Sequence, residues 1–228
     1  MKILSYIPRV FKHLMNRRTA VLLLIVLVIL GLWYHVRATR NAFDDAYLTY
    51  AELAQRGDTA AYVPGVQDNP IRQQLNSVLT EVLADTVSPT QRLGRAQEGL
   101  LLLAESEQQI NSIGELSDQI TVALARMDLA AKNASDLTKK GTMRRIVSLA
   151  KDRLQIVQDI RGLSYRANFE TEKIFTRIIE DGGSLTSSHI TELNRQVPEV
   201  EAQFNRRSNL YRDLETVYRE LSESYASL

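Results

Sequence analysis

The side chains that most often carry catalysis or bind metals are few and widely spaced in this sequence. The chain has three histidines, at positions 13, 35 and 189, and no cysteine. Zinc sites on helices use pairs such as His-x-x-x-His or Glu-x-x-His, because these spacings place two ligands on one face. Neither pair occurs in the chain. The lack of cysteine also excludes thiolate metal sites, cysteine nucleophiles and a disulfide framework.

The candidate motifs for a serine nucleophile or a phosphate-binding loop that we considered do not fit their templates. The chain has no Gly-x-Ser-x-Gly, and Ser135 and Lys139 are one residue too far apart for Ser-x-x-Lys. Gly162-Leu-Ser164 and Gly182-Gly-Ser184 lack the lysine of a phosphate loop. The many carboxylates alternate with Arg and Lys at helical spacing, which is typical of a solvated face. We therefore expect no enzyme activity, no cofactor and no metal.

The balance of charge argues against a nucleic-acid partner. The chain has 28 basic and 27 acidic side chains and a formal net charge of +1. A generic nucleic-acid binder needs a basic excess to neutralise phosphates. The charge is unevenly distributed, however, because residues 1–18 hold five basic side chains and no acidic one. This segment is predicted to be a basic cytoplasmic tail.

Residues 19–36 are predicted to be a transmembrane helix. This stretch has no charged side chain, and as a helix it spans about 27 Å, close to the hydrocarbon thickness of a bilayer. Trp33 and Tyr34 lie where an aromatic belt is expected. A cleavable signal peptide is the alternative, but residues 35–40 offer no small-x-small cleavage site. The stretch is therefore interpreted as a retained signal-anchor.

The flanking charges predict how the anchor is oriented. Five basic residues precede it and only Arg37 and Arg40 follow closely, so the positive-inside rule places the N-terminus in the cytoplasm. The bulk of the chain is then extracytoplasmic, on the outer side of an inner or plasma membrane. If the membrane is a bacterial inner membrane, that side is the periplasm. Asn133-Ala-Ser135 fits a glycosylation acceptor on that side.

The rest of the chain has the pattern of an all-α fold. Apolar residues recur with a period near 3.6 for tens of residues, and strand signals are nearly absent. Residues 37–86 are predicted to form membrane-proximal helices on either side of a loop at 57–70. Residues 87–228 are predicted to form a long antiparallel helical bundle with coiled-coil character, because short turns join its three long helices.

Local signals mark where the long helices begin and end. Ser88-Pro89-Thr90-Gln91 combines a capping serine, a proline at the first helical position and a glutamine at the third. The helix that follows is expected to run for about 45 residues by its apolar pattern. A turn is expected within 133–142, which includes Gly141, and a second at Asp181-Gly-Gly-Ser184.

The last helix carries the most regular pattern in the chain. From Ile190 to Leu228, residues at alternating spacings of three and four are apolar or tyrosine except Arg207. Such a repeat predicts a coiled-coil seam, and Pro198 inside it is expected to kink the helix. The candidate interaction seam consists of Phe204, Arg207, Tyr211, Leu214, Tyr218, Leu221 and Tyr225.

Two features of this seam have alternative interpretations. Arg207 either pairs with Glu107, which interrupts the stripe of the first long helix, or extends its charged group to solvent. The tyrosines at 211, 218 and 225 recur every seven residues, so their rings are expected to stack along one seam, either as core packing or as a recognition surface.

The expected architecture resembles the ectodomains of bacterial chemoreceptors and sensor kinases, and the LemA group of anchored helical proteins. The preferred function is a scaffold or accessory subunit of a membrane complex, whose partners are the lipid bilayer and other membrane-complex proteins or further copies of the chain. The alternative is an extracytoplasmic sensor or regulatory ectodomain that signals through a partner protein. A buried polar pocket would favour the sensor, and an exposed apolar stripe would favour the scaffold.

The charge asymmetry around residues 19–36 gives a testable topology. A reporter that works only outside the cytoplasm should be active when fused after Leu228, because the positive-inside rule keeps the N-terminus in the cytoplasm. Activity from a cytoplasm-specific reporter at the same position would reverse the orientation.

Overall fold

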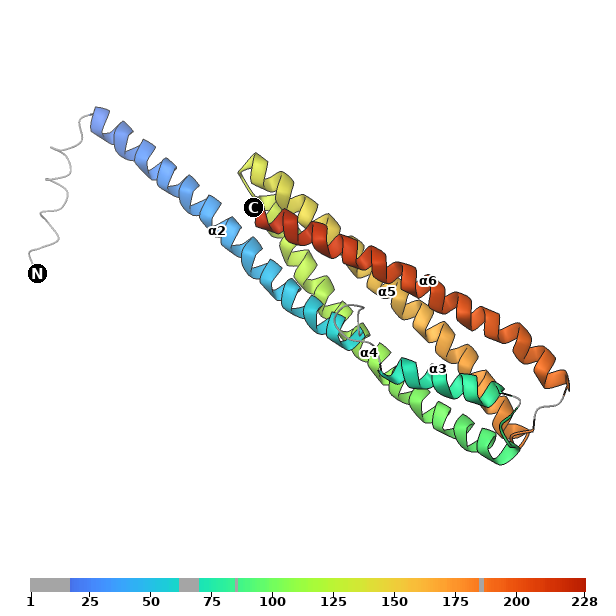
Figure 1. Ribbon diagram of the computed structural model, residues 1–228. Helices are drawn as coiled ribbons and strands as arrows, with labels where there is room; N and C mark the ends of the chain where they lie inside the picture. The colour runs from blue at the N-terminus through green and yellow to red at the C-terminus, as the bar shows by residue number, and fades with distance from the viewer. Residues whose placement is uncertain (1–16, 62–69, 85, 185–186) are drawn as a thin grey trace, which may run out of the picture.

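The computed structural model describes the chain except residues 1–16, 62–69, 85 and 185–186. The part described is all-helical, as predicted, with five helices and no strand (Figure 1). In chain order the helices are α2 (Arg17–Ala61), α3 (Pro70–Leu83), α4 (Pro89–Asn133), α5 (Leu137–Glu180) and α6 (Ser187–Ala226).

Helix α2 joins the apolar segment to the rest of the fold without a break. It is the one helix, among the residues described, that is long and apolar enough to span a membrane, and none of its most apolar window is buried inside the protein. Its later part is buried instead, beginning at Phe43 and continuing through Tyr50 to Ala54. The same helix therefore presents apolar side chains outward in its first half and packs against the protein in its second.

The end of α2 differs from the prediction. A loop was expected from Gly57, but the helix continues through Gly57 to Ala61, so the expected loop at 57–70 is wrong for its first five residues. One glycine costs a helix only about 1 kcal/mol relative to alanine, which the neighbouring helical residues offset. Residues 62–69 of that predicted loop lie outside the described part, and its last residue, Pro70, begins α3.

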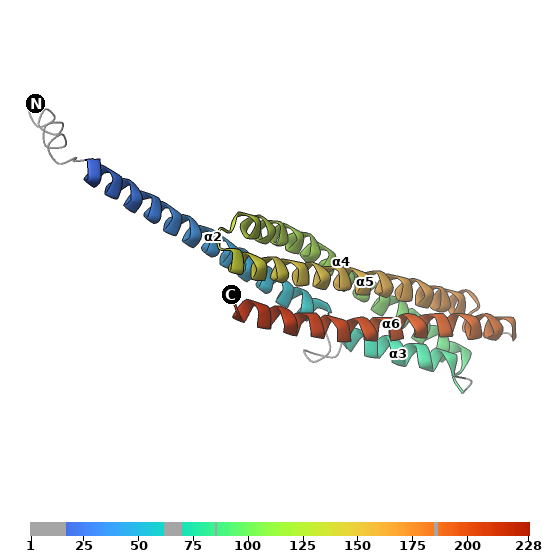
Figure 2. The same cartoon turned by 90° about the horizontal axis from the view of Figure 1, so that it is seen from above.

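The three longest helices after α2 form a rod in which α5 lies between the other two. Helix α5 packs on both α4 and α6, while α2 and α3 pack on α4. Figures 1 and 2 show α5 running back along α4, and α6 running back along α5. The chain end at Leu228 therefore lies at the same end of the rod as the turn between α4 and α5.

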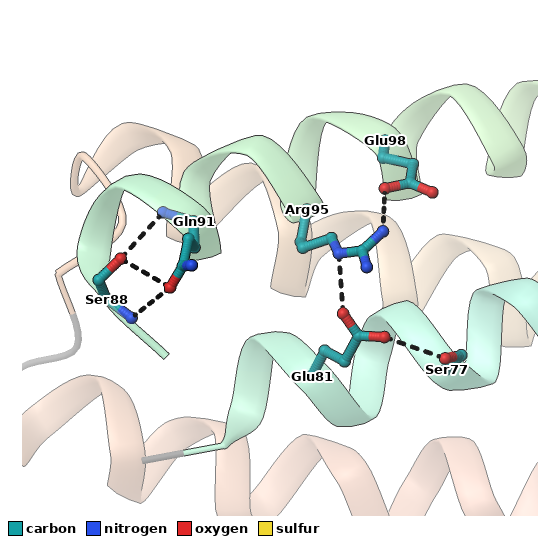
Figure 3. Close-up of polar contacts among 6 residues, drawn as sticks. All are labelled: Ser77, Glu81, Ser88, Gln91, Arg95 and Glu98. Carbon is teal, nitrogen blue, oxygen red and sulfur yellow. Dashed lines mark hydrogen bonds and ion pairs between the residues drawn. The ribbon is translucent and has the colours of Figure 1, made fainter. Parts of the chain in front are cut away.

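The start of α4 is the predicted capping box. The Ser88 hydroxyl oxygen accepts a hydrogen bond from the backbone N–H of Gln91 at 3.4 Å, and the Gln91 side-chain oxygen accepts one from the backbone N–H of Ser88 at 3.3 Å (Figure 3). These two bonds satisfy donors that a helix start leaves without a partner. The helix then runs for 45 residues, which confirms the predicted length.

The turn between α4 and α5 is shorter than predicted. Helix α5 begins at Leu137, so Gly141 lies inside the helix rather than in the turn expected within 133–142. The Asp136 carboxylate accepts a hydrogen bond from the backbone N–H of Lys139 at 3.2 Å, which caps the helix four residues before that glycine. The capping residue therefore sets the helix start.

The turn after α5 has the predicted glycines, and one of them makes a close contact. Gly182 and Gly183 have φ of 61° and 80°, a left-handed conformation that suits glycine. A Cβ at Gly183 would lie 1.9 Å from the carbonyl oxygen of Pro89. The end of α5 can therefore meet the start of α4 only with glycine at this position.

The same end of the rod is held together by a buried arginine. Arg92 is 6% exposed and donates to three backbone carbonyls, those of Val82 at 2.8 Å, Ala84 at 2.9 Å and Gly183 at 3.0 Å. These carbonyls belong to the end of α3, the segment after it and the turn after α5. One side chain thus joins the end of α3 and the start of α4 to the turn after α5, whose Gly183 is 91 residues from Arg92 in sequence.

The role of Arg92 can be tested with Arg95, one turn further along α4. Arg92→Ala should lower the free energy of unfolding by about 3 kcal/mol or more, because it leaves buried carbonyls without a donor. Arg95→Ala should leave the melting midpoint nearly unchanged, since the Arg95 side chain is 44% exposed and its ion pairs with Glu81 and Glu98 lie at the surface (Figure 3). Circular dichroism melts of the full chain in mild detergent measure both, and equal melting midpoints for the two variants would contradict this role.

Candidate interaction surfaces

The predicted seam of α6 is divided between buried and exposed side chains. Tyr211, Leu214 and Leu221 are buried at 4%, 2% and 3% exposure, and Tyr225 is half-buried. Tyr218 is 55% exposed. The side chains of Phe204 and Arg207 lie outside the described part, so the seam remains a prediction at those two positions.

The buried seam residues contact different neighbours at different levels of the rod. Tyr211 and Leu214 pack with Ile160 of α5, and the Arg72 guanidinium of α3 donates to the Tyr211 hydroxyl at 3.3 Å. Leu221 belongs instead to the larger cluster that includes Phe43 of α2. The apolar side of α6 is therefore covered within the same chain at these positions.

The tyrosines do not form the continuous stack that the seven-residue spacing suggested. The Tyr225 ring stacks on Tyr47 of α2, with centroids 3.7 Å apart and planes 12° apart, while Tyr218 between it and Tyr211 is exposed. The prediction was wrong because the aromatic partners come from other helices. The ring of Tyr225 joins the end of α6 to the helix that carries the apolar segment.

Burial raises the pKa of both tyrosines in this stacked pair. Loss of solvent, and then the neighbouring Tyr50 and Tyr225, raise the pKa of Tyr47 to about 12. Burial also raises the pKa of Tyr225, followed by the effect of the Asp44 carboxylate, which accepts from its hydroxyl at 3.5 Å. Both phenols are therefore un-ionised near neutral pH, which suits a packing role.

The ion pair suggested by the sequence between Glu107 and Arg207 remains a prediction. Glu107 is exposed on α4, and the side chain of Arg207 is not described, so the proposed ion pair is untested. Helix α6 continues from Ser187 to Ala226 through Pro198.

One groove, which we name the α2–α4 groove, runs between α2 and α4. Its volume is about 490 Å³, and its α2 wall carries small side chains every third or fourth residue. Leu129 on the opposite wall is 61% exposed, and Val122, two turns before it on α4, is 55% exposed. The lining residues are Ala38, Thr39, Ala42, Asp45, Ala46, Thr49, Arg126, Leu129, Ala130 and Asn133.

A second groove, which we name the membrane-exit groove, lies where α2 leaves the apolar segment. Its volume is about 510 Å³, and it separates α2 from the turn between α4 and α5. The Arg37 guanidinium lies 5.3 Å from the centre of the Trp33 ring, and Arg40 lies 3.8 Å from the Asp44 carboxylate. The lining residues are Trp33, Val36, Arg37, Thr39, Arg40, Asn41, Asp44, Ala134, Ser135, Asp136, Lys139 and Met143.

The chemical motifs considered in the sequence do not come together in the part described. No group of three or more His, Cys, Asp or Glu there could hold a metal ion. His35 is exposed on α2, and the side chains of His13 and His189 are not described. One Ser-x-x-Lys spacing, at Ser148 and Lys151, did escape the sequence reasoning, and both residues are exposed on α5.

The chain matches no protein family, no curated protein and no solved structure. Its likeness to receptor ectodomains and to the LemA group is therefore one of expected architecture, and its function has to be argued from its own surfaces.

The buried part of the seam makes a direct prediction. Leu214→Ala should lower the free energy of unfolding by about 2 to 5 kcal/mol, because Leu214 is buried against α5. Arg212→Ala, two residues away and exposed, should change it by less than about 0.5 kcal/mol. Chemical denaturation of the full chain in detergent compares the two, and equal small losses would show that this position is not buried in solution.

Proposed function

We propose that this is a non-enzymatic, single-pass membrane protein whose extracytoplasmic helical bundle acts as a scaffold or accessory subunit of a membrane complex. In this proposal the long helices form an antiparallel bundle with coiled-coil packing, to which the 3.5-residue repeat of α6 contributes. The continuity of α2 supports it, because one helix belongs both to the apolar segment and to the buried core. The bundle would then be held at a set position above the bilayer.

The α2–α4 groove is the observation that carries this proposal. It begins at Ala38, two residues after the apolar stretch ends at residue 36, and follows α2 away from that stretch. Small residues such as Ala38 and Ala42 allow a second helix to approach closely. Leu129 adds exposed apolar surface on the opposite wall, and the exposed Val122 lies two turns before it on α4. The occupant we propose is a helix of another membrane protein that crosses the bilayer next to α2 and continues into this groove.

The sensor hypothesis has weaker support. It calls for a buried polar pocket between helices, whereas the polar groove found near the end of the apolar stretch is an open one between α2 and the α4–α5 turn. The exposed apolar side chains elsewhere on the rod are dispersed over several helices, and isolated ones need no partner. The α2–α4 groove combines exposed Leu129 with small residues in one place.

Site-specific photocrosslinking in native membranes tests this occupant. A photoreactive residue at Leu129, which lines the groove, or at Val122, seven residues before it on the same face of α4, should give one discrete adduct with a second membrane protein. The same residue at Asp152, exposed on α5, should give none. Leu129→Glu should abolish the adduct formed at Val122 without lowering the melting midpoint, since Leu129 is exposed.

Two results would contradict the proposal. An adduct of twice the mass of the chain would identify a second copy as the occupant of the groove. No adduct from either Leu129 or Val122 would show that the groove is not a docking site.

A further inference from the structure

The turn between α4 and α5 lies beside the helix that carries the apolar segment. The membrane-exit groove brings residues 134–143 next to Trp33 and Arg37, so this turn lies at the level where an aromatic belt would meet the bilayer surface. Figures 1 and 2 show the turn as the part of α4 and α5 closest to the apolar half of α2. The opposite end of the rod is separated from it by the full length of α4.

An apolar side chain projects from this turn. Leu137, the first residue of α5, is 84% exposed, more than any other large apolar side chain that the structure describes. A single exposed leucine is ordinary on a soluble surface. At the level of Trp33, however, it is placed to enter the interface between lipid headgroups and acyl chains.

Basic residues flank that leucine in the sequence. Residues 132–145 contain Lys132, Lys139, Lys140, Arg144 and Arg145 and a single acidic residue, Asp136. Some of this charge is neutralised by residues on neighbouring turns and helices, because Asp128 lies 2.7 Å from Lys132 and Glu220 of α6 lies 3.9 Å from Arg145. The remaining charge is still basic, which suits an anionic surface.

In the membrane-exit groove, basic side chains of α2 lie opposite those of the turn. Arg37 and Arg40 of α2 line it opposite Lys139 of α5. Asp44 and Asp136 also line it, and Asp44 pairs with Arg40. Arginine and lysine on two walls of one groove are the groups that bind a phosphate ester, arginine with two parallel hydrogen bonds.

We propose that the α4–α5 turn is a second membrane contact, with Leu137 in the interface and the phosphate of an anionic phospholipid bound in the membrane-exit groove by Arg37, Arg40 and Lys139. This inference rests on the proposed membrane anchoring by α2. Two contacts with one bilayer restrict the tilt of the rod, and so they set the direction in which the α2–α4 groove faces a partner.

The absence of cysteine makes a clean test possible in the full chain. Leu137→Cys carries an environment-sensitive fluorophore, and the protein is placed in vesicles that also contain a nitroxide-labelled lipid. The matched control is Leu101→Cys, which is 75% exposed on the same rod but lies in the first third of α4, far from the turn. Quenching and a blue shift are expected at position 137 and not at position 101.

The headgroup site is tested by lipid composition. Quenching at position 137 should be at least twofold greater in vesicles with one third phosphatidylglycerol than in phosphatidylcholine alone, because the surrounding charge is basic. The double variant Arg37→Gln with Lys139→Gln should remove this difference. Lys173→Gln with Arg177→Gln, at the far end of α5, should preserve it.

The outcomes separate this inference from the anchoring on which it depends. Protein that fails to float with the vesicles would overturn the anchoring itself. Protein that floats but shows an aqueous signal at position 137 would overturn the second contact alone. Equal quenching in both lipids, unaffected by the double variant, would overturn the phospholipid site and leave a purely apolar contact.

Discussion

The structure depends on α2, a single helix whose two halves lie in different environments. The first half of α2 presents valine, leucine and isoleucine side chains that no part of the described protein covers, while its second half is buried among α4, α5 and the end of α6. The hydrophobic effect acts on both halves, but only the second is satisfied by the chain itself. Because no turn separates them, the position of the rod follows from the direction of the apolar half.

The two ends of the rod are stabilised by different interactions. Near the apolar half, aromatic and methionine side chains pack closely, and Tyr47 and Tyr225 stack face to face. At the far end, the apolar cluster that includes Leu75, Leu103 and Phe175 is accompanied by directed backbone contacts, because Arg92 holds three carbonyls and Gly183 lies against Pro89. Apolar packing tolerates changes of shape better than a set of directed hydrogen bonds does. We therefore regard the far end as the part that fixes how the helices are aligned.

The two grooves flank the same stretch of α2, and this gives the functional proposals a common basis. The α2–α4 groove has small and apolar walls, which suit a helix, whereas the membrane-exit groove has charged walls, which suit a phosphate group. Both begin close to the end of the apolar stretch. In the two proposals, one groove would contact the partner and the other the lipid surface.

The helices could be predicted from the amino-acid sequence, apart from the end of α2 and the start of α5, because the signals for them act over a few residues. The cap at Ser88, the glycines at 182 and 183 and the uncharged stretch at 19–36 each specify local structure without any distant contact. What each helix faces depends on how the helices pack together. Tyr211, Tyr218 and Tyr225 have equivalent places in the repeat, yet one is buried against α5 and α3, one is exposed and one stacks on α2. Their different surroundings come from α2 and α3, more than a hundred residues away in sequence, and from α5, the neighbouring helix of the rod. The spacing of residues within α6 cannot encode which of these helices lies beside each tyrosine.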